Sequence, residues 1–418
     1  QGNSSFGAAA GDVIGDDIEK IIGTNFNDLL VGDANDNTLD GGGGVDRFLG
    51  GNGFDTVDYS QATASVGIRL DGGTNFGQAT GETFDGIEGL IGSRFNDVLV
   101  GNDDDKRIDG FTGVDTFFGN GSLVSYESSP TAVGVRMDNQ ALNFGEAAGD
   151  RYFNIVGVQG SDFNDVLVGG KAGGNGGFSA LFGGMGDDRL FVGQGARDLD
   201  GNEGNDTFFG ATSNVGGQLI VMSGDEGNDV FFAGIGAESF FGGDGFDILD
   251  YRNATSGVIV TESTAGPFRA SGGGDGDTWA GIEILIGSNF NDSLANDGPA
   301  VIKRGLGGND FIGGDASVAE TLDGGTGNDN LNGGNSAGLP GSFDTYIFRP
   351  REGNDRITQF NDDDDTIQFE GFGFVGVFDA LNRAVDTQGD VVFQFDQGGS
   401  LVVENITKAA LIDDILIS

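Results

Sequence analysis

The carboxylates of this chain recur at a fixed place in a nine-residue phrase, Gly-Gly-x-Gly-x-Asp-x-apolar-x. The strictest copies are GGGGVDRFL at 41–49, GGNGFDTVD at 50–58, GGMGDDRLF at 183–191, GGDGFDILD at 242–250 and GGTGNDNLN at 324–332. The glycines permit a tight loop with positive φ that exposes backbone carbonyls, and the Asp adds a carboxylate. A stack of such loops is an array of oxygen-lined cages, which suit Ca²⁺.

Looser copies of the phrase fill the intervals between the strict ones. They read GFTGVDTFF at 110–118, GNEGNDTFF at 201–209, GDEGNDVFF at 224–232 and AGIGAESFF at 233–241. In the last copy Glu238 replaces the Asp and adds a methylene, which weakens the expected cage. Three further copies carry Lys106, Arg197 or Val301 at the carboxylate position, and we expect those sites to bind no ion.

The composition limits both the fold and the partners. With 82 Gly in 418 residues, regular helices can be only a minor part of the chain. The formal net charge is −46, from 66 acidic and 20 basic residues. This balance argues against nucleic acid or an anionic membrane as a partner and favours bound cations. A hydrophobic fraction of 37% with 35 Phe argues against permanent disorder.

The chain contains neither His nor Cys. Catalytic triads that use His, zinc or iron sites with His ligands, thiolate metal sites and disulfides are therefore excluded. No carboxylate pair stands apart from the repeats as a glycosidase pair would. We expect no enzymatic activity in this chain. No apolar run approaches the length of a membrane helix, so no membrane insertion is expected either.

A longer repeat encloses the short one. IEKIIGTNFNDLLVG at 18–32 returns as IEGLIGSRFNDVLVG at 87–101, IVGVQGSDFNDVLVG at 155–169 and IEILIGSNFNDSLAN at 282–296. Inserts headed by Tyr59, Tyr126 and Tyr251 precede three of these phrases and alternate apolar with polar residues, as half-buried strands do. Residues 6–23 match the rear half of such an insert, at 76–92. We expect this partial insert to derive from a longer repetitive precursor or to be a degenerate cap.

These periods predict an all-β fold, a parallel β-roll or β-solenoid of glycine- and aspartate-rich nonapeptide repeats with inserted β flaps and a C-terminal β cap. Two nonapeptides make one coil with two short parallel strands, and the loops lie in two columns. The cap combines strands with one short helix near 406–414. The predicted parts are 1–58, a partial insert plus repeats; 59–125, an insert plus repeats; 126–250, an insert plus an extended roll; 251–342, an insert plus a roll; and 343–418, the cap.

On these phrases the chain resembles the RTX, or hemolysin-type, calcium-binding repeat proteins of large secreted bacterial products. The resemblance covers nearly the whole sequence. It implies a β-roll that folds on meeting millimolar calcium outside the cell, and export through a type I secretion channel with a C-terminal signal. The segment from GNDRITQF onward is similar to such a signal.

The resemblance also implies which residues hold Ca²⁺ at multiple sites. The carboxylate ligands implied by the nonapeptides are Asp46, Asp55, Asp115, Asp188, Asp206, Asp229, Asp247, Asp310, Asp329 and Asp355. The corresponding residues of the FND phrases are Asp28, Asp97, Asp165 and Asp292. Carbonyl ligands are implied at Gly41, Gly43, Gly50, Gly183, Gly242 and Gly324. The acidic run 362–365 is read either as a further ion site or as a solvated turn.

Two classes of function fit the sequence. The first is an extracellular, secreted or cell-surface structural or adhesive protein that associates with itself in a filament, layer or matrix, with cell-surface polysaccharide as a further partner. The second is the calcium-binding tail of a longer secreted enzyme or toxin. Repeats over almost the whole chain favour the first. Phe118, Phe209, Phe232 and Phe241 are expected on the outer face, either covered by inserts or cap, or as an exposed stripe for lateral association.

The repeats predict that folding requires calcium. Coils of a solenoid repeat at about 4.8 Å, the spacing of strands. Two carboxylates at that distance repel by roughly 3–4 kcal/mol at an effective dielectric constant near 20. Summed along a column, this exceeds the margin of about 5–15 kcal/mol that stabilises a folded domain.

We therefore expect the chain to be disordered in chelator and folded at millimolar Ca²⁺. Far-ultraviolet circular dichroism measures this directly. Unchanged β content in chelator would contradict an obligatory role for calcium.

Overall fold

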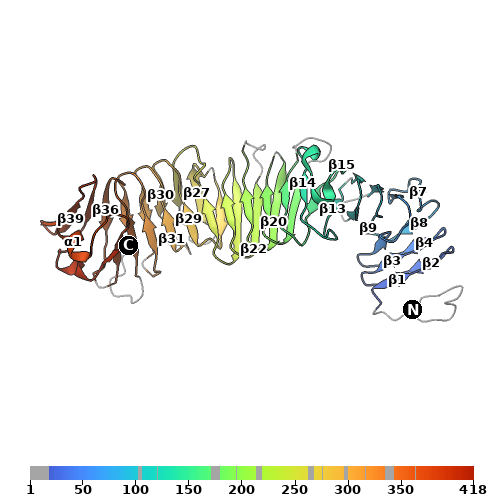
Figure 1. Ribbon diagram of the computed structural model, residues 1–418, viewed down its shortest axis with the longest axis horizontal. Helices are drawn as coiled ribbons and strands as arrows, with labels where there is room; N and C mark the ends of the chain where they lie inside the picture. Colours follow the sequence, from blue (N-terminus) through green and yellow to red (C-terminus); the bar gives the residue numbers. More distant parts are fainter. Residues whose placement is uncertain are drawn as a thin grey trace. The chain divides into compact units, whose positions relative to one another are not determined.

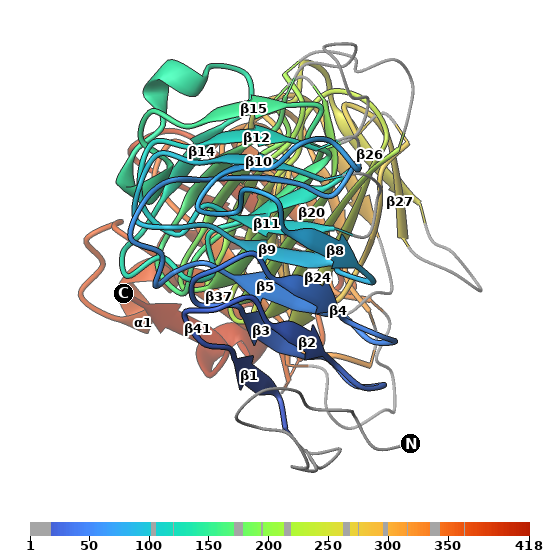
Figure 2. The ribbon, with the colours of Figure 1, turned by 90° about the vertical axis from the view of Figure 1, so that its right-hand side faces the viewer.

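The computed structural model describes residues 18–101, 106–119, 121–170, 179–193, 195–212, 219–261, 268–274, 276–295, 300–315, 317–334, 343–362 and 364–418. The partial insert proposed before residue 18 and the loop at 335–342 lie outside these residues. The chain divides into two compact units, Gln1–Gly204 and Asn205–Ser418. Within each unit, short strands stack edge to edge in parallel ladders, which confirms the predicted β-roll (Figures 1 and 2).

The first unit contains one unbroken parallel ladder. Its strands, in order of pairing, are β1 (Lys20–Ile22), β3 (Thr38–Asp40), β5 (Thr56–Asp58), β9 (Gly89–Ile91), β11 (Arg107–Asp109), β13 (Leu123–Ser125), β16 (Gly157–Gln159), β18 (Ser179–Met185) and β20 (Ala196–Glu203). Thr38 pairs with Thr56, 18 residues on. One coil therefore consists of two nonapeptides, as the sequence predicts.

The opposite side of the first unit has three shorter ladders. They are β2 (Leu29–Val31), β4 (Arg47–Leu49) and β8 (Thr83–Asp85); then β6 (Val66–Arg69), β10 (Val98–Val100), β12 (Thr116–Phe118) and β15 (Arg151–Phe153), with β7 (Phe76–Gly77) antiparallel to β6; then β14 (Gly134–Arg136), β17 (Val166–Val168) and β19 (Arg189–Phe191). The insert that contains β6 to β8 thus ends one ladder and begins the next. The insert with β14 and β15 does the same, with the 3-10 turns η2 (Gln140–Leu142) and η3 (Gly145–Ala147) between them.

The second unit has a similar plan, with one unbroken ladder and shorter ladders on its other side. Its unbroken ladder is β21 (Thr207–Phe209), β23 (Val230–Phe232), β25 (Ile248–Asp250), β29 (Ile284–Ile286), β31 (Ile302–Arg304), β33 (Thr321–Asp323), β35 (Thr345–Phe348), β37 (Thr366–Phe369) and β41 (Ile415–Ile417). The other side has β22 (Ile220–Glu226), β24 (Glu238–Asp244) and β28 (Thr278–Ala280), then β26 (Val258–Thr261), β30 (Ser293–Ala295), β32 (Phe311–Gly313), β34 (Asn330–Asn332), β36 (Asn354–Thr358) and β40 (Ser400–Val403). The flap strand β27 (Phe268–Gly272) joins β26 to β28 by antiparallel pairing.

The middle residue of most three-residue strands points into the roll, with β41 an exception, since its Leu416 is exposed. Phe208 and Phe231 are fully buried, and their rings stack with centroids 4.7 Å apart. The strand residues on either side of each are half-buried and face outward, as the alternation of strand side chains requires. The core is therefore built from these inward side chains, which are apolar in most strands and a lysine, Lys303, in β31.

The C-terminal cap departs from the prediction in its helix. The structure places the single α-helix of the described residues, α1, at Val377–Leu381. The helix expected near 406–414 is wrong: that segment has only the 3-10 turn η4 (Ala410–Ile412), because the chain must become extended again at Ile415 to pair with β37. Strands β38 (Ala384–Thr387) and β39 (Asp390–Gln394) complete the cap. None of the helices in the described ranges is long and apolar enough to cross a membrane.

The outward Phe residues do not form one stripe. Phe209 stacks on Phe232 at 5.2 Å between ring centroids in one ladder of the second unit. Phe241 lies in β24, on the other side of that unit, so its expected place beside them is wrong. In the first unit, Phe118 stacks on Phe153 of an insert at 4.8 Å.

Candidate metal centre

The loops that contain the nonapeptide aspartates share a left-handed backbone at their second and fourth positions. In the loop before β25, Gly243 and Gly245 have φ of 110° and 146°. The second position stays left-handed even where it is not glycine, as at Asp225 (φ 68°) and Leu306 (φ 74°). Because such a φ is costly for a residue with a Cβ, the fold must require it there. We call loops with this backbone glycine loops.

One oxygen of each loop carboxylate bridges to the preceding coil. The backbone N–H of Asp229 donates to Oδ1 of Asp247 at 2.8 Å, and that of Asp310 donates to Oδ1 of Asp329 at the same distance. The same bond reaches Oδ1 of Asp46, Asp55, Asp115, Asp188, Asp229, Asp310 and Asp355 from the coil before each. The carboxylates therefore form columns along the roll, one per coil.

The second oxygen is buried without a hydrogen-bond partner in several of the described glycine loops. This holds for Oδ2 of Asp46, Asp55, Asp229, Asp247, Asp310 and Asp329. Burying such an oxygen without compensation is costly, so the geometry calls for a cation or a proton.

Backbone carbonyls converge on the same oxygens. A Cβ built on Gly242 would lie 2.3 Å from Oδ2 of Asp247 and 1.7 Å from the carbonyl oxygen of Gly281, in the next coil. A Cβ on Gly305 would meet Oδ2 of Asp310 at 2.2 Å and the carbonyl of Gly324 at 2.5 Å. The loops thus place one carboxylate oxygen and a carbonyl of the next coil around one cradle. Oxygen ligands of this mixture fit Ca²⁺, so the residues present match the implied ion.

The predicted glycines line these cradles. Gly41, Gly50, Gly183, Gly242 and Gly324 each stand where a Cβ would fall within 2.5 Å of an Oδ2 of their own loop. Gly43 differs, since a Cβ there would approach only Asn25 of the preceding coil. The identities of the ligands remain predictions. No three His, Cys, Asp or Glu side chains of the described residues cluster as a metal site, which agrees with one carboxylate per loop and the other ligands from the backbone.

Several loop carboxylates have a pKa above the ordinary value of an aspartate, mainly because they are buried. Burial, opposed in part by the bond from Asn37, raises the pKa of Asp55 to about 6. Burial, with the charges of Asp206 and Asp247 adding to it, raises the pKa of Asp229 to about 7. The pKa of Asp115 rises to about 8, again mainly by burial. Each neighbour in the column thus makes ionisation of the next one harder.

The FND phrases are built differently from the glycine loops. The Oδ2 of Asp165 accepts hydrogen bonds from the backbone N–H of Ser161 at 2.5 Å and from its hydroxyl at 3.1 Å. Asp97 and Asp292 have the same partners in Ser93 and Ser288. Thr24 donates both bonds to Asp28. Three of the four FND carboxylates that the sequence predicts as ligands, Asp97, Asp165 and Asp292, therefore have both oxygens occupied within the chain, and in Asp28 both bonds go to Oδ2.

Sequence reasoning missed Glu320 and Asp344 as carboxylates of the columns and gave Asp365 only as a member of the acidic run 362–365. Asp344 and Asp365 follow no glycine loop, yet the N–H of Glu320 donates to Asp344 and that of Asp344 donates to Asp365. Asp365 is 3% exposed, so this member of the acidic run is not a solvated turn. The signal was an acidic residue followed by Thr and an apolar residue, which Glu320, Asp344 and Asp365 share with Asp115 and Asp206.

Two lysines meet column carboxylates directly. Lys106, which replaces a loop Asp, places Nζ 3.1 Å from Oε1 of Glu88, one coil earlier. Lys303 lies at the inward position of β31, is fully buried, and contacts Oε1 of Glu320 at 2.6 Å and the carbonyl of Gly313 at 2.7 Å. Its ammonium supplies the positive charge that a loop carboxylate otherwise lacks. The nonapeptide pattern did not predict that Lys303 would be buried or that it would contact a carboxylate.

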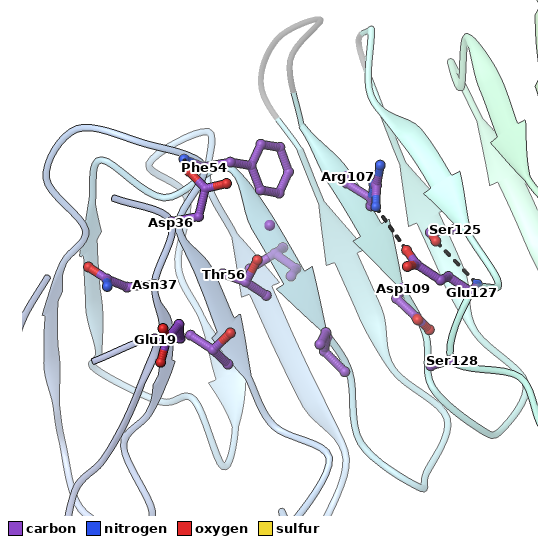
Figure 3. Close-up of a pocket in the computed structure, with 14 residues that line it drawn as sticks. Glu19, Asp36, Asn37, Phe54, Thr56, Arg107, Asp109, Ser125, Glu127 and Ser128 are labelled. Carbon is purple, nitrogen blue, oxygen red and sulfur yellow. Dashed lines mark hydrogen bonds and ion pairs between the residues drawn. The ribbon is translucent and has the colours of Figure 1, made fainter. Parts of the chain in front are cut away.

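A polar groove of about 430 Å³ lies on the unbroken ladder of the first unit (Figure 3). Arg107 lies between the ring of Phe54 and the carboxylate of Glu127, to which it donates a hydrogen bond at 2.9 Å. Asp36 and Glu19 line the other end. The groove is separate from the loop cradles and contains none of the predicted ligands.

The stacked coils, left-handed glycine loops and columns of buried carboxylates define a calcium-binding parallel β-roll. The family model of the RTX calcium-binding nonapeptide repeat matches residues 22–57, 91–122, 174–199, 182–214, 221–249 and 316–337. The chain therefore contains several copies of the RTX calcium-binding nonapeptide repeat along its length, and such repeats bind Ca²⁺ at multiple sites.

Comparison with other proteins adds little beyond the family. The crystal structure of the extracellular lipase LipA from Serratia marcescens is similar to 55% of this chain at 19% sequence identity, with a TM-score of 0.27. The similar region covers 40% of the lipase chain, less than half of its length. No curated protein matches the sequence.

Replacement of Lys303 by Met is expected to destabilise the second unit. The change leaves the buried Glu320 without its counter-charge, which lowers the free energy of unfolding by about 3–5 kcal/mol. Thermal or denaturant unfolding in saturating Ca²⁺ measures the loss. Lys20→Met is the matched control, because Lys20 is exposed in its ion pair with Asp58 and should cost less than about 1 kcal/mol. Equal losses in both variants would contradict the role given to Lys303.

The calcium-free protein is expected to gain stability on acidification. The folded-state pKa of Asp55, Asp229 and Asp310 is about 6, 7 and 7, above the ordinary value of 3.8. The folded state therefore binds more protons than the unfolded state between about pH 4 and pH 7, and stability falls as the pH rises through that window. Circular dichroism of dialysed protein should show more β structure near pH 4 than at pH 8. Equal β content at both pH values would show that carboxylate repulsion does not limit folding.

Proposed function

We propose that this chain is an extracellular structural protein that folds on binding Ca²⁺ and associates with copies of itself in a filament or layer. One observation carries the proposal: coils of the roll, with their flaps and cap, account for the strand ladders of both units in the described ranges. The proposal gives the chain no catalytic role. The sequence has no His or Cys, and the buried loop carboxylates described above take part in the columns.

A requirement for calcium allows such a protein to remain unfolded during export and to fold once it is outside the cell. Without ions the columns repel, which supports the view that the chain stays unfolded where calcium is scarce. Unfolded chains pass narrow channels, so this supports secretion of the type I kind. Extracellular calcium at millimolar concentration then neutralises the columns and stabilises the coils.

The outer face of the second unit supports contact between copies. Phe209 and Phe232 stack there beside a groove of about 350 Å³ that Ile235 and Ala254 also line. Ile235 is 40% exposed. A stacked aromatic pair next to an apolar groove is a surface that gains by burial against a second copy.

Negative-stain microscopy and light scattering test this proposal with purified protein. Filaments or sheets are expected with Ca²⁺ and are expected to disappear in chelator. Replacing both Phe209 and Phe232 by Ser should reduce assembly, because about 25 cal/mol per Å² of buried apolar area is lost at each contact.

Phe378→Ser is the matched control, because Phe378 is 71% exposed in α1, outside the groove and the glycine loops, and should not alter assembly. Isolated rods in Ca²⁺ for the unmodified protein would overturn self-association. That result would favour the other class, the calcium-binding part of a longer secreted enzyme or toxin.

A further inference from the structure

The FND loops occupy a particular place in the ladders. Asp97 precedes β10, and its Oδ1 accepts the N–H of Val66 at the start of the insert strand β6. Asp165 and Asp292 accept the corresponding bonds from Val133 and Val258, where β14 and β26 begin. Each of these loops is therefore the first loop of a new ladder, next to an insert strand instead of another loop.

The backbone of the FND loops lacks the left-handed turns of the glycine loops. At the second position Ser93, Ser161 and Ser288 replace the residue that elsewhere has positive φ, and none of these three described residues has one. The fourth position has Phe in place of Gly, as at Phe163, again without a positive φ. The serine hydroxyl and N–H instead turn inward and close on the carboxylate. The FND loop is thus a second loop type, stabilised by its own donors.

The other end of a ladder is closed by tyrosine. The insert strand β15 ends the ladder of β10 and β12, and it is preceded by Asp150. Oδ1 of Asp150 accepts the N–H of Asp115 at 2.7 Å, as in any column, but Oδ2 accepts the hydroxyl of Tyr126 at 2.7 Å. In the preceding insert, the hydroxyl of Tyr59 donates to Glu82 in the same way. Both phenols are buried, at 3% and 5% exposure.

We propose that the FND carboxylates Asp97, Asp165 and Asp292 and the insert carboxylates Glu82 and Asp150 hold no Ca²⁺, because the chain's own hydroxyl and N–H donors occupy them. Calcium is then confined to the glycine loops between inserts. Asp97 and Asp292 accept three hydrogen bonds each and Asp165 accepts four, so their lone pairs are directed at donors of the chain instead of a cation. Asp150 accepts two such bonds, and Glu82 accepts the bond from Tyr59. The inserts, which the family pattern leaves without a role, become ion-free junctions that divide the roll into separate calcium columns.

This inference rests on the calcium-binding fold and is independent of self-assembly. It also explains the residue choice in the inserts. A Tyr hydroxyl reaches across the coil to the buried Oδ2 of Asp150, whereas Ser161 reaches only within its own loop. Long and short donors therefore stand at opposite ends of a column.

The number of ions bound per chain tests the proposal. Calcium is measured by atomic emission after dialysis against a fixed free Ca²⁺ concentration, with circular dichroism of the same samples to verify folding. Asp165→Asn and Asp292→Asn should bind as many ions as the unmodified chain, whereas Asp229→Asn and Asp310→Asn, in glycine loops, should each bind at least one ion fewer. Loss of an ion in Asp165→Asn or Asp292→Asn would overturn the proposal.

A gain-of-site variant keeps the test decisive if an Asn variant does not fold. Replacing Ser161 and Phe163 by Gly converts GSDFND into GGDGND, which matches the glycine loops and retains Asp165. The freed carboxylate should then bind one additional ion per chain. Tb³⁺ luminescence, sensitised by Tyr and Trp, gives a second readout of the count. An unchanged count would show that the FND loop already holds an ion, which overturns the proposal.

Discussion

A line of buried carboxylates, one per coil, is the constraint on which this structure depends. Parallel coils bring equivalent residues to about the spacing of neighbouring strands, so each Asp is close to the Asp before and after it. The N–H of one coil satisfies Oδ1 of the next, as between Asp229 and Asp247. That bond leaves Oδ2 to be compensated separately. Loop conformation, insert placement and the acidic composition all follow from how this second oxygen is paired.

The chain meets this need with several kinds of positive group or donor. The glycine loops present an oxygen cradle, as around Gly242 and Asp247, and suit an ion. Lys303 brings an ammonium to Glu320 from inside the core. Serine and tyrosine hydroxyls act at Asp165 and Asp150. A calcium ion can compensate the carboxylate only when the surrounding medium supplies calcium, whereas the lysine and the hydroxyls are part of the chain and always present. The balance between them sets how much of the roll responds to calcium.

Sequence periodicity predicted the fold well, because each coil is formed by residues that are close together in the sequence. The Asp and the apolar residue two places later fix the loop and the inward side chain, and the spacing of 18 residues between Thr38 and Thr56 follows. The differences between loops were harder to predict. Asp97 and Asp115 look equivalent in the sequence, but Ser93 closes the first loop while Phe111 keeps a left-handed backbone in the second. Lys303 was missed because its partner Glu320 follows no glycine phrase. In each case the partner of a carboxylate is decided by contacts between coils, which a single sequence period does not encode.

The spacing between coils also limits how such a chain can change over generations. Asp292, Asp310 and Asp329 are separated by 18 and 19 residues, while Asp165 and Asp188 are 23 apart, so the loops accept extra residues but the ladder does not lose its alignment. Each coil contacts only its neighbours, and every column has its own ends. Unequal recombination between repeats that adds or removes a whole coil therefore leaves all other contacts intact. The gene can therefore gain or lose one coil at a time while the encoded protein still folds.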